Sequence, residues 1–264
     1  MRKTCLIGDS HIGPLKTATS SGHIEQQHDL TFFACHVSYI SNLVLRGNKL
    51  VSISDELTEL LKYFSGGRDC IDIESYDDFV IIGYNFVMAD IVALYRTYVS
   101  DSMPGPRDGK YLLSDECFLA VTEELSSRRE ALHLARSIRS VCDKPITVLT
   151  CPNPGLGMPE EKIFKGYPPC HQAVRNGDDQ TLATLFREVC ARIAKKNNLT
   201  IIPPISEVAA NGVFNLREYC CLPEVIDDEI DGGDLMNGMV HGNDLYGRAL
   251  LPYIFVHDDI EITP

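Results

Sequence analysis

Short apolar runs alternate along this chain with longer stretches in which apolar residues recur at helical spacing. The apolar runs are rich in β-branched and aromatic residues, and several end at or beside glycine or proline, which is typical of buried strands. The predicted strands cover residues 4–8, 30–37, 77–85, 146–151 and 199–204. A shorter apolar run predicts either an extra strand or one arm of a hairpin at 49–53.

The helical pattern is clearest over residues 178–196, where the apolar positions fall on one face. Residues 54–64 predict a short helix with Ser54 as its N-cap. Residues 115–141 predict two helices that break near 126–127. Strands that alternate with helices of this length favour an α/β fold, with a mainly parallel sheet and helices on both faces.

The length of 264 residues favours a single domain over residues 1–264. Segments rich in proline and glycine predict loops at 102–110 and 151–170, each long enough to form a lid or a substrate wall. The acidic stretch at 227–234 contains two glycines and is also a predicted loop.

The acidic net charge of the chain argues against polyanionic binding partners. There are 37 acidic and 24 basic residues, which gives a net charge of −13. Nucleic acids and anionic membranes are bound by basic surfaces, so neither is an expected partner. The N-terminus lacks the apolar stretch of a signal peptide, and no run approaches about 18 apolar residues. A cytoplasmic location is therefore expected.

Ten cysteines are spread through the chain, and no two have the Cys-x-x-Cys spacing typical of zinc and redox sites. In a reducing compartment they are expected to be free thiols. Cys5, Cys151 and Cys190 fall within apolar patterns, which predicts that they are buried. Neither a metal nor another cofactor is expected.

Polar residues follow several predicted strands. Ser10 follows the first strand, His36 lies at the end of the second, Gly83 and Asn85 end the third, and Asn153 follows the run at 146–151. In an open α/β sheet, ligands bind beyond the carboxyl ends of the strands. The sequence therefore predicts a binding or catalytic site at this edge.

Ser10 has two interpretations. It stands where a helix is expected to begin, so its side chain can simply cap that helix. Alternatively its hydroxyl is a nucleophile, with its own N–H and the side-chain amide of Asn85 as donors to an oxyanion. His241 precedes a predicted terminal helix and is a candidate base for Ser10.

Three motifs together resemble a known family. They are Gly-Asp-Ser-His at 8–11, Gly-Tyr-Asn at 83–85 and His-Gly-Asn-Asp-Leu-Tyr-Gly at 241–247. In this order they resemble the SGNH (GDSL-type) hydrolases, and in particular a little-characterised bacterial branch with a Ser-His first block and a late His-x-Asn-x-x-Tyr-Gly motif. The resemblance implies a three-layer α/β/α sandwich around a five-stranded, mainly parallel sheet.

The resemblance also implies roles for individual residues. Ser10 would be the nucleophile and His241 the general base, acting through an acyl-enzyme. The family places its catalytic Asp three residues before the histidine, where this chain has Gly238. Asp234, the earlier Asp231 or a backbone carbonyl would then orient the imidazole.

Further residues would complete the oxyanion and substrate site. The family's second-strand glycine is absent from Ala-Cys-His-Val at 34–37, so His36 and Val37 would supply that backbone donor. His11 either contacts substrate or faces the following helix. Asn153 either lines the pocket or forms a turn between prolines.

The favoured interpretation is a serine hydrolase, an esterase or deacetylase, that cleaves an ester of a small molecule or glycan. One alternative is an O-acyltransferase, in which a sugar hydroxyl intercepts the same acyl-enzyme. The other is a catalytically weak module of the same fold that binds a glycan or a partner.

Overall fold

A computed structural model describes residues 1–20, 28–107, 109–158, 160, 168–221 and 238–255. The centre of the fold is a five-stranded sheet in which every neighbouring pair is parallel. Its strands are β1 Arg2–Gly8, β2 His28–Ala34, β6 Asp78–Ile82, β9 Ile146–Leu149 and β10 Thr200–Ile202. Their order across the sheet is β10-β9-β6-β1-β2, so the α/β class and the five predicted strands are confirmed.

Four of these strands end earlier than their apolar runs. The predicted strand at 77–85 stops at Ile82 because Gly83, Tyr84 and Asn85 have φ angles of 90°, 49° and 59°. Such positive φ values are incompatible with a strand. The predicted strand at 30–37 stops at Ala34, and the 3₁₀ turn η2 begins three residues later. The polar groups at these ends therefore lie in turns at the edge of the sheet.

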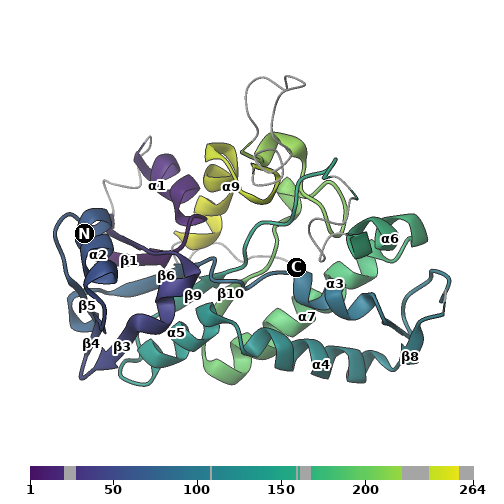
Figure 1. Ribbon diagram of the computed structural model, residues 1–264, viewed down its shortest axis with the longest axis horizontal. Coiled ribbons are helices and arrows are strands. Elements are labelled where there is room, and N and C mark those ends of the chain that lie inside the picture. Colours follow the sequence, from purple (N-terminus) through teal and green to yellow (C-terminus); the bar gives the residue numbers. More distant parts are fainter. Residues whose placement is uncertain (21–27, 108, 159, 161–167, 222–237, 256–264) are drawn as a thin grey trace.

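Helices cover both faces of the sheet, which gives the three predicted layers. One face is covered by α1 (Ile12–Ser20) and α9 (Asp244–Ile254), which lie above the sheet in Figure 1. The core on this side includes the strand residues Leu6, Val80 and Leu149.

The opposite face packs against α2 (Asp55–Ser65), α5 (Glu130–Arg139) and α7 (Asp179–Asn197). Its core includes Cys5 and Ile7 of β1. Leu6, which lies between them in the sequence, belongs to the core on the other face. Successive strand side chains point to opposite faces, so a strand covered on both sides is apolar throughout.

The helical segment at 115–141 forms two helices, as predicted. They are α4 (Asp115–Ser127) and α5, with Arg128 and Arg129 between them. The Nε atom of Arg129 donates to the buried Asp90 carboxylate at 3.0 Å, which fixes the position where α5 begins. The predicted N-cap of α2 is also confirmed.

The strand predicted at 49–53 is confirmed, whereas several other short elements were not predicted. The run at 49–53 is β4, the centre of an antiparallel three-stranded sheet, and a two-stranded parallel pair follows later in the chain. β4 spans Lys49–Ser52, and the strands that were not predicted are β3 Leu43–Arg46, β5 Cys70–Asp72, β7 Tyr98–Ser100 and β8 Tyr111–Leu113. The additional helices are α3 Ala89–Tyr95 and α6 Pro168–Asn176, with 3₁₀ turns η2 Val37–Asn42, η3 Ile73–Ser75, η4 Ser206–Val208 and η5 Arg217–Tyr219.

The predicted loops have different outcomes. Residues 102–110 connect β7 and β8, with residue 108 not described. Of the predicted loop at 151–170, the last residues belong to α6, while 159 and 161–167 lie outside the described residues. The acidic segment at 227–234 lies outside them entirely.

The cysteines are free thiols, and Cys5, Cys151 and Cys190 are buried as their patterns predict. Burial raises the pKa of all three thiols, which makes them poor nucleophiles. Within the described residues, no three His, Cys, Asp or Glu side chains gather as a metal site would require. None of the described helices is both long and apolar enough to cross a membrane.

Candidate active site

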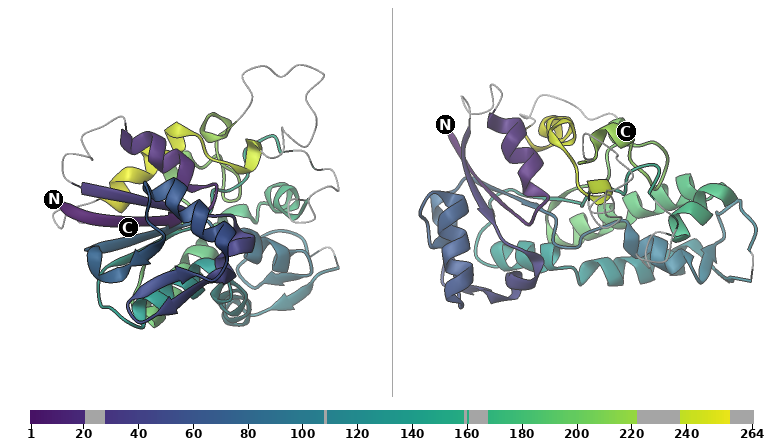
Figure 2. Two further views of the ribbon diagram at one scale, coloured as in Figure 1. Left: turned by 60° about the vertical axis from the view of Figure 1, so that its left-hand side comes forward. Right: turned by 45° about the horizontal axis from the view of Figure 1, so that its top comes forward.

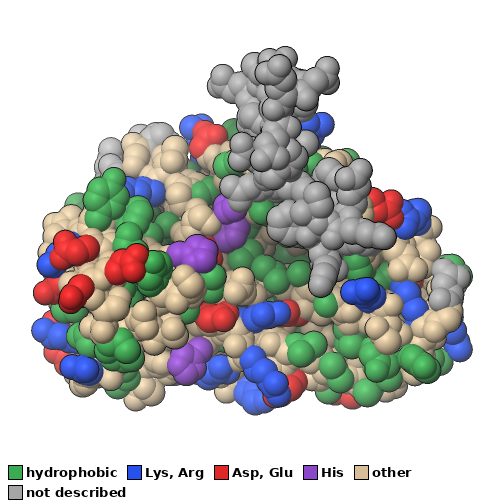
Figure 3. Space-filling model, viewed as in Figure 1, with side chains coloured by type: hydrophobic (Ala, Val, Ile, Leu, Met, Phe, Trp, Pro, Cys, Tyr) green, Lys and Arg blue, Asp and Glu red, His purple; other side chains and the backbone are tan. Residues whose placement is uncertain are grey.

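The two ends of the chain meet at the carboxyl edge of the sheet. Ser10 lies in the turn between β1 and α1, and His241 lies just before α9. The Oγ atom of Ser10 is 2.8 Å from the Nε2 atom of His241, although the residues are 231 positions apart in sequence. The Ser10 side chain is exposed, so a substrate can reach the hydroxyl. Histidine side chains are visible near the middle of the face in Figure 3.

This meeting depends on how α1 and α9 pack. The two helices lie side by side in Figures 1 and 2. At their contact, a Cβ atom on Gly247 would be 2.1 Å from the Pro14 carbonyl oxygen and 3.2 Å from the Ala18 Cβ. Only glycine therefore allows this approach. Because α1 follows Ser10 and α9 follows His241, the contact sets the distance between the two side chains.

Asp9 joins the turn that carries Ser10 to the turn after β6. One carboxylate oxygen accepts the N–H of Tyr84 at 2.8 Å, and the other accepts the N–H of His11 at 3.0 Å. Gly83 makes room for this carboxylate, since a Cβ there would be 2.1 Å from Asp9 Oδ1. The Asp of the Gly-Asp-Ser-His motif is thus a positioning group, which holds the turn that carries Ser10.

Tyr84 provides a second link between the same turns. Its side chain is fully buried, and its hydroxyl donates to the Gly8 carbonyl at 2.8 Å. The left-handed backbone from Gly83 to Asn85 leaves Asn85 exposed beside the site. The Asn85 Nδ2 atom is 3.5 Å from a carboxylate oxygen of Glu130, a weak contact that leaves the amide able to turn.

The backbone N–H groups of the predicted oxyanion site are those of Ser10 and Val37. Among the described residues, no acceptor takes the N–H of Ser10 or that of Val37. The side chain of His36, in contrast, caps η2, because its Nδ1 atom accepts the N–H of Ser38 at 3.2 Å. His36 thus shapes the turn that presents the Val37 N–H.

This cap creates a second serine–histidine contact. The Ser38 Oγ atom is 2.8 Å from His36 Nδ1, the same distance as in the pair of Ser10 and His241. Here the residues are two positions apart and the ring nitrogen already accepts a backbone N–H. The pair therefore belongs to a local cap, whereas Ser10 and His241 are joined only by the tertiary fold.

The loop that carries His241 is held by its backbone. The His241 carbonyl accepts the N–H of Cys221 at 2.8 Å, and its N–H donates to the Gly238 carbonyl at 3.3 Å. Gly238 occupies the position of the family's aspartate. Asp234, the predicted orienting group, and Asp231 both lie outside the described residues.

Asn243 is a positioning residue that the sequence reasoning missed. Its Oδ1 atom accepts the N–H of Tyr246 and so caps α9. Its Nδ2 atom donates to the carbonyls of Glu218 at 2.7 Å and Cys220 at 3.1 Å. An asparagine directly before a predicted helix was the available signal, because that residue type is a preferred N-cap.

His11 stacks on the catalytic candidate His241. The ring centroids are 4.8 Å apart and the planes are inclined by 23°. The Nδ1 atom of His11 is buried and has no hydrogen-bond partner among the described residues. Burial lowers the pKa of His11 to about 4, opposed by the carboxylate of Asp9 and aided by His241. His11 is therefore neutral at pH 7 and packs against His241.

The low pKa of His11 predicts a pH effect on stability. The unfolded state binds a proton at His11 below about pH 6.5, while the folded state does so only near pH 4. The free energy of unfolding is thus expected to fall as the pH drops between these values, by on the order of 3 kcal/mol from this residue. His11→Phe, which keeps a stacked ring, should remove that part of the decline in urea unfolding. The prediction would be contradicted if the free energies of unfolding of wild type and His11→Phe differed by the same amount at pH 7 and at pH 4.

Asn153 lies in a different place from Ser10. It is 4% exposed and lines a cavity of about 240 Å³ whose lining includes neither Ser10 nor His241. A second cavity, of about 440 Å³, is lined by residues of η2 and α5, including Glu130. Glu130, which lines this second cavity, contacts Asn85.

Comparisons with protein-family models and with curated protein sequences gave no match. Solved structures gave matches at low identity. One is an extracellular lipase from Streptomyces rimosus, with 11% identity, a TM-score of 0.45, and coverage of 96% of this chain and 98% of the lipase. Another is a Streptococcus pneumoniae protein provisionally described as a platelet activating factor, with 11% identity, a TM-score of 0.40, and coverage of 96% of this chain and 82% of that protein. At this identity, neither protein's activity transfers to this chain.

Proposed function

We propose that this protein is a serine hydrolase that cleaves a carboxylic ester of a small molecule or glycan. The observation that carries the proposal is the 2.8 Å contact between Ser10 Oγ and His241 Nε2 at the carboxyl edge of a parallel sheet. A hydroxyl this close to an imidazole can transfer its proton as it attacks a carbonyl. The resemblance of the three motifs to the SGNH hydrolases supports the same roles.

The reaction follows from this geometry. Ser10 Oγ attacks the ester carbonyl while its proton moves to His241 Nε2. The resulting oxyanion is stabilised by the N–H groups of Ser10 and Val37 and by the Asn85 amide once it turns from Glu130. The tetrahedral intermediate collapses, and the leaving alkoxide takes the proton from His241. Water then attacks the acyl-enzyme by the same steps, releasing the acid and restoring the Ser10 hydroxyl.

A fluorophosphonate probe tests the proposal directly. Ser10 Oγ displaces fluoride and forms a stable bond to phosphorus, so the purified chain should be labelled and the label should map to Ser10 by mass spectrometry. Hydrolysis of p-nitrophenyl esters of increasing acyl length should accompany labelling. Purified, folded protein that takes no label and cleaves none of these esters would instead be the binding module. Transfer of the acyl group to an added alcohol at the expense of hydrolysis would identify an acyltransferase.

The oxyanion role of Asn85 has its own prediction. Asn85→Ala should lower kcat by about 10²–10³ with a smaller change in KM, because the donor acts on charge that develops in the transition state. Asn48→Ala is a matched control. Asn48 lies in the β3–β4 turn, and its amide also donates to a glutamate, Glu74. Equal activity of the two variants would remove Asn85 from the oxyanion site.

We further propose that Asp234 orients His241 through its other ring nitrogen. In a serine triad this group holds the imidazole in the productive tautomer. Asp234→Asn should therefore lower kcat more than Asp231→Asn, in steady-state assays of the two variants side by side. The reverse order would assign the role to Asp231.

A further inference from the structure

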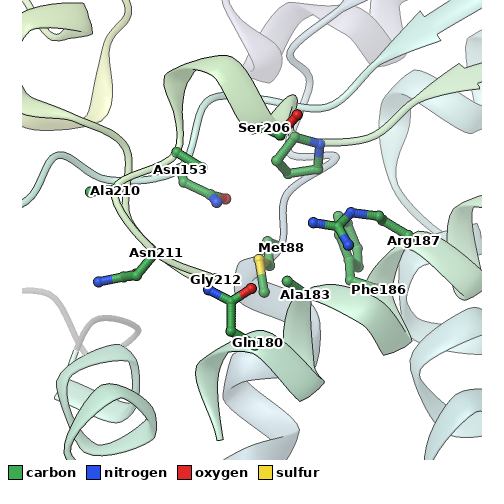
Figure 4. Close-up of a pocket in the computed structure, with 12 residues that line it drawn as sticks. Met88, Asn153, Gln180, Ala183, Phe186, Arg187, Ser206, Ala210, Asn211 and Gly212 are labelled. Carbon is green, nitrogen blue, oxygen red and sulfur yellow. The ribbon is translucent and has the colours of Figure 1, made fainter. Parts of the chain in front are cut away.

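The cavity that contains Asn153 lies apart from the proposed active site. It is bordered by the segments that follow β9 and β10 and by α7, and Figure 4 shows its lining side chains. Neighbouring strands are spaced by about 4.8 Å, and β9 lies two positions from β1, so the cavity is on the order of 10 Å or more along the sheet edge from Ser10. It is thus a separate feature of the same edge.

Asn153 supplies a polar group that the fold itself does not use. Its side chain is 4% exposed, and its amide takes part in none of the side-chain hydrogen bonds among the described residues. In Figure 4 its amide points into the cavity. An amide in this orientation can hydrogen-bond a ligand that enters the cavity.

Arg187 supplies a positive charge at the same cavity. Its guanidinium is directed toward the cavity in Figure 4, and it takes part in none of the ion pairs formed among the described residues. Further along the same helix, Arg192 is instead held by Glu116 and Glu188. A guanidinium that faces a cavity and has no ion-pair partner among the described residues can bind an anionic ligand there.

Other lining residues are both polar (Gln180, Ser206 and Asn211) and apolar. Phe186 is fully buried, Met88 is 4% exposed and Ala183 is 7% exposed, and all three line the cavity. The volume of about 240 Å³ is slightly below the 300–1,000 Å³ of typical ligand pockets, which limits the ligand to a small molecule.

We propose that this cavity binds a small organic carboxylate, with its carboxyl group on Arg187 and Asn153 and its short alkyl chain on Met88 and Phe186. The guanidinium and the amide both donate hydrogen bonds, as a carboxylate requires. The apolar side chains of Met88 and Phe186 favour such a ligand over an inorganic anion. This binding does not depend on Ser10, so it stands or falls independently of the proposed hydrolase activity.

Isothermal titration of the full chain with hexanoate tests the proposal. Hexanoate should bind to the wild-type chain and equally to Ser10→Ala, whereas hexanamide of the same length should bind at least about tenfold more weakly, since it lacks the charge. Arg187→Gln and Asn153→Asp should each weaken hexanoate binding about tenfold or more. Arg192→Gln removes an arginine from the same helix outside the cavity and should leave binding unchanged.

Three results would overturn the proposal. The first is equal affinity for hexanamide and hexanoate. The second is tighter binding of inorganic phosphate than of hexanoate in a competition titration. The third is hexanoate binding of wild-type affinity by a folded Arg187→Gln variant. The thermal unfolding midpoint of each variant establishes that it is folded, and Arg187 is exposed, so its substitution is expected to leave the fold intact.

Discussion

Ser10→Ala and His241→Gln are each expected to lower kcat for ester hydrolysis by about 10⁵–10⁶, to near the background rate. Ser10→Ala removes the atom that attacks the carbonyl. His241→Gln keeps a polar side chain but removes the nitrogen 2.8 Å from Ser10 Oγ that accepts the proton. Steady-state kinetics on the best p-nitrophenyl ester, with fluorophosphonate labelling of the same samples, measure both effects.

The double variant sharpens this prediction. If Ser10 and His241 act as one unit, removing both should cost little more than removing either, because each single substitution already stops the same step. Effects that multiply in the double variant would show that the two residues work independently, which the proposed mechanism does not allow.

Ser38→Ala is the matched control for Ser10→Ala. It also removes a hydroxyl 2.8 Å from a histidine nitrogen, but in the local cap of η2. We expect its kcat to stay within a few fold of wild type and its labelling to persist. Loss of labelling in Ser38→Ala with retention in Ser10→Ala would move the nucleophile to Ser38.

Gly247→Val is expected to destabilise the fold and to abolish hydrolysis together. A side chain at this position meets the Pro14 carbonyl at 2.1 Å, so α9 must move away from α1. Overpacking of this kind costs about 3 kcal/mol. The displacement also separates His241 from Ser10, because each residue lies in the short segment before one of the two helices. Urea unfolding and kcat at a temperature where the variant remains folded measure the two consequences separately.

Gly13→Ala is the control for Gly247→Val. Gly13 lies on α1, yet a Cβ there would meet nothing within 4 Å. Alanine is a better helix former than glycine by about 0.5–1 kcal/mol, so the variant should be as stable as wild type or slightly more stable, and fully active. A Gly247→Val protein with normal stability and activity would show that close helix contact does not set the site.

The predicted and observed folds agree where the sequence pattern is long or strongly apolar. The five central strands have strongly apolar runs, and the helices at 115–141 and 178–196 have long patterns of apolar residues at helical spacing. Such patterns predict the element without knowledge of its tertiary contacts. The elements that were missed are mostly very short, such as β7 and β8 with three residues each. Three residues carry too little periodicity to predict a strand, and such strands form only because the surrounding fold supplies a partner.

Strand ends were also decided by tertiary contacts. The apolar run at 77–85 predicts a single strand, but β6 ends at Ile82. Beyond that point, the Asp9 carboxylate accepts the N–H of Tyr84 and fills the space beside Gly83. That contact stabilises left-handed backbone that the local sequence does not require. Likewise Asn153 follows its strand as predicted, yet the fold directs it into a separate cavity with Arg187.

By itself, the sequence determined the α/β class, the central strands and a serine at the end of the first of them, because these depend on local periodicity and on the order of elements. Only the tertiary structure decided that the Ser10 hydroxyl lies 2.8 Å from His241, that His11 stacks behind that ring, and that Asn153 and Arg187 share a cavity. The physical reason is that contacts between residues far apart in the chain depend on how closely α1 and α9, or α7 and the sheet edge, can pack. The requirement for glycine at position 247 is evident only from the position of α1, whose Pro14 carbonyl leaves no room for a side chain there.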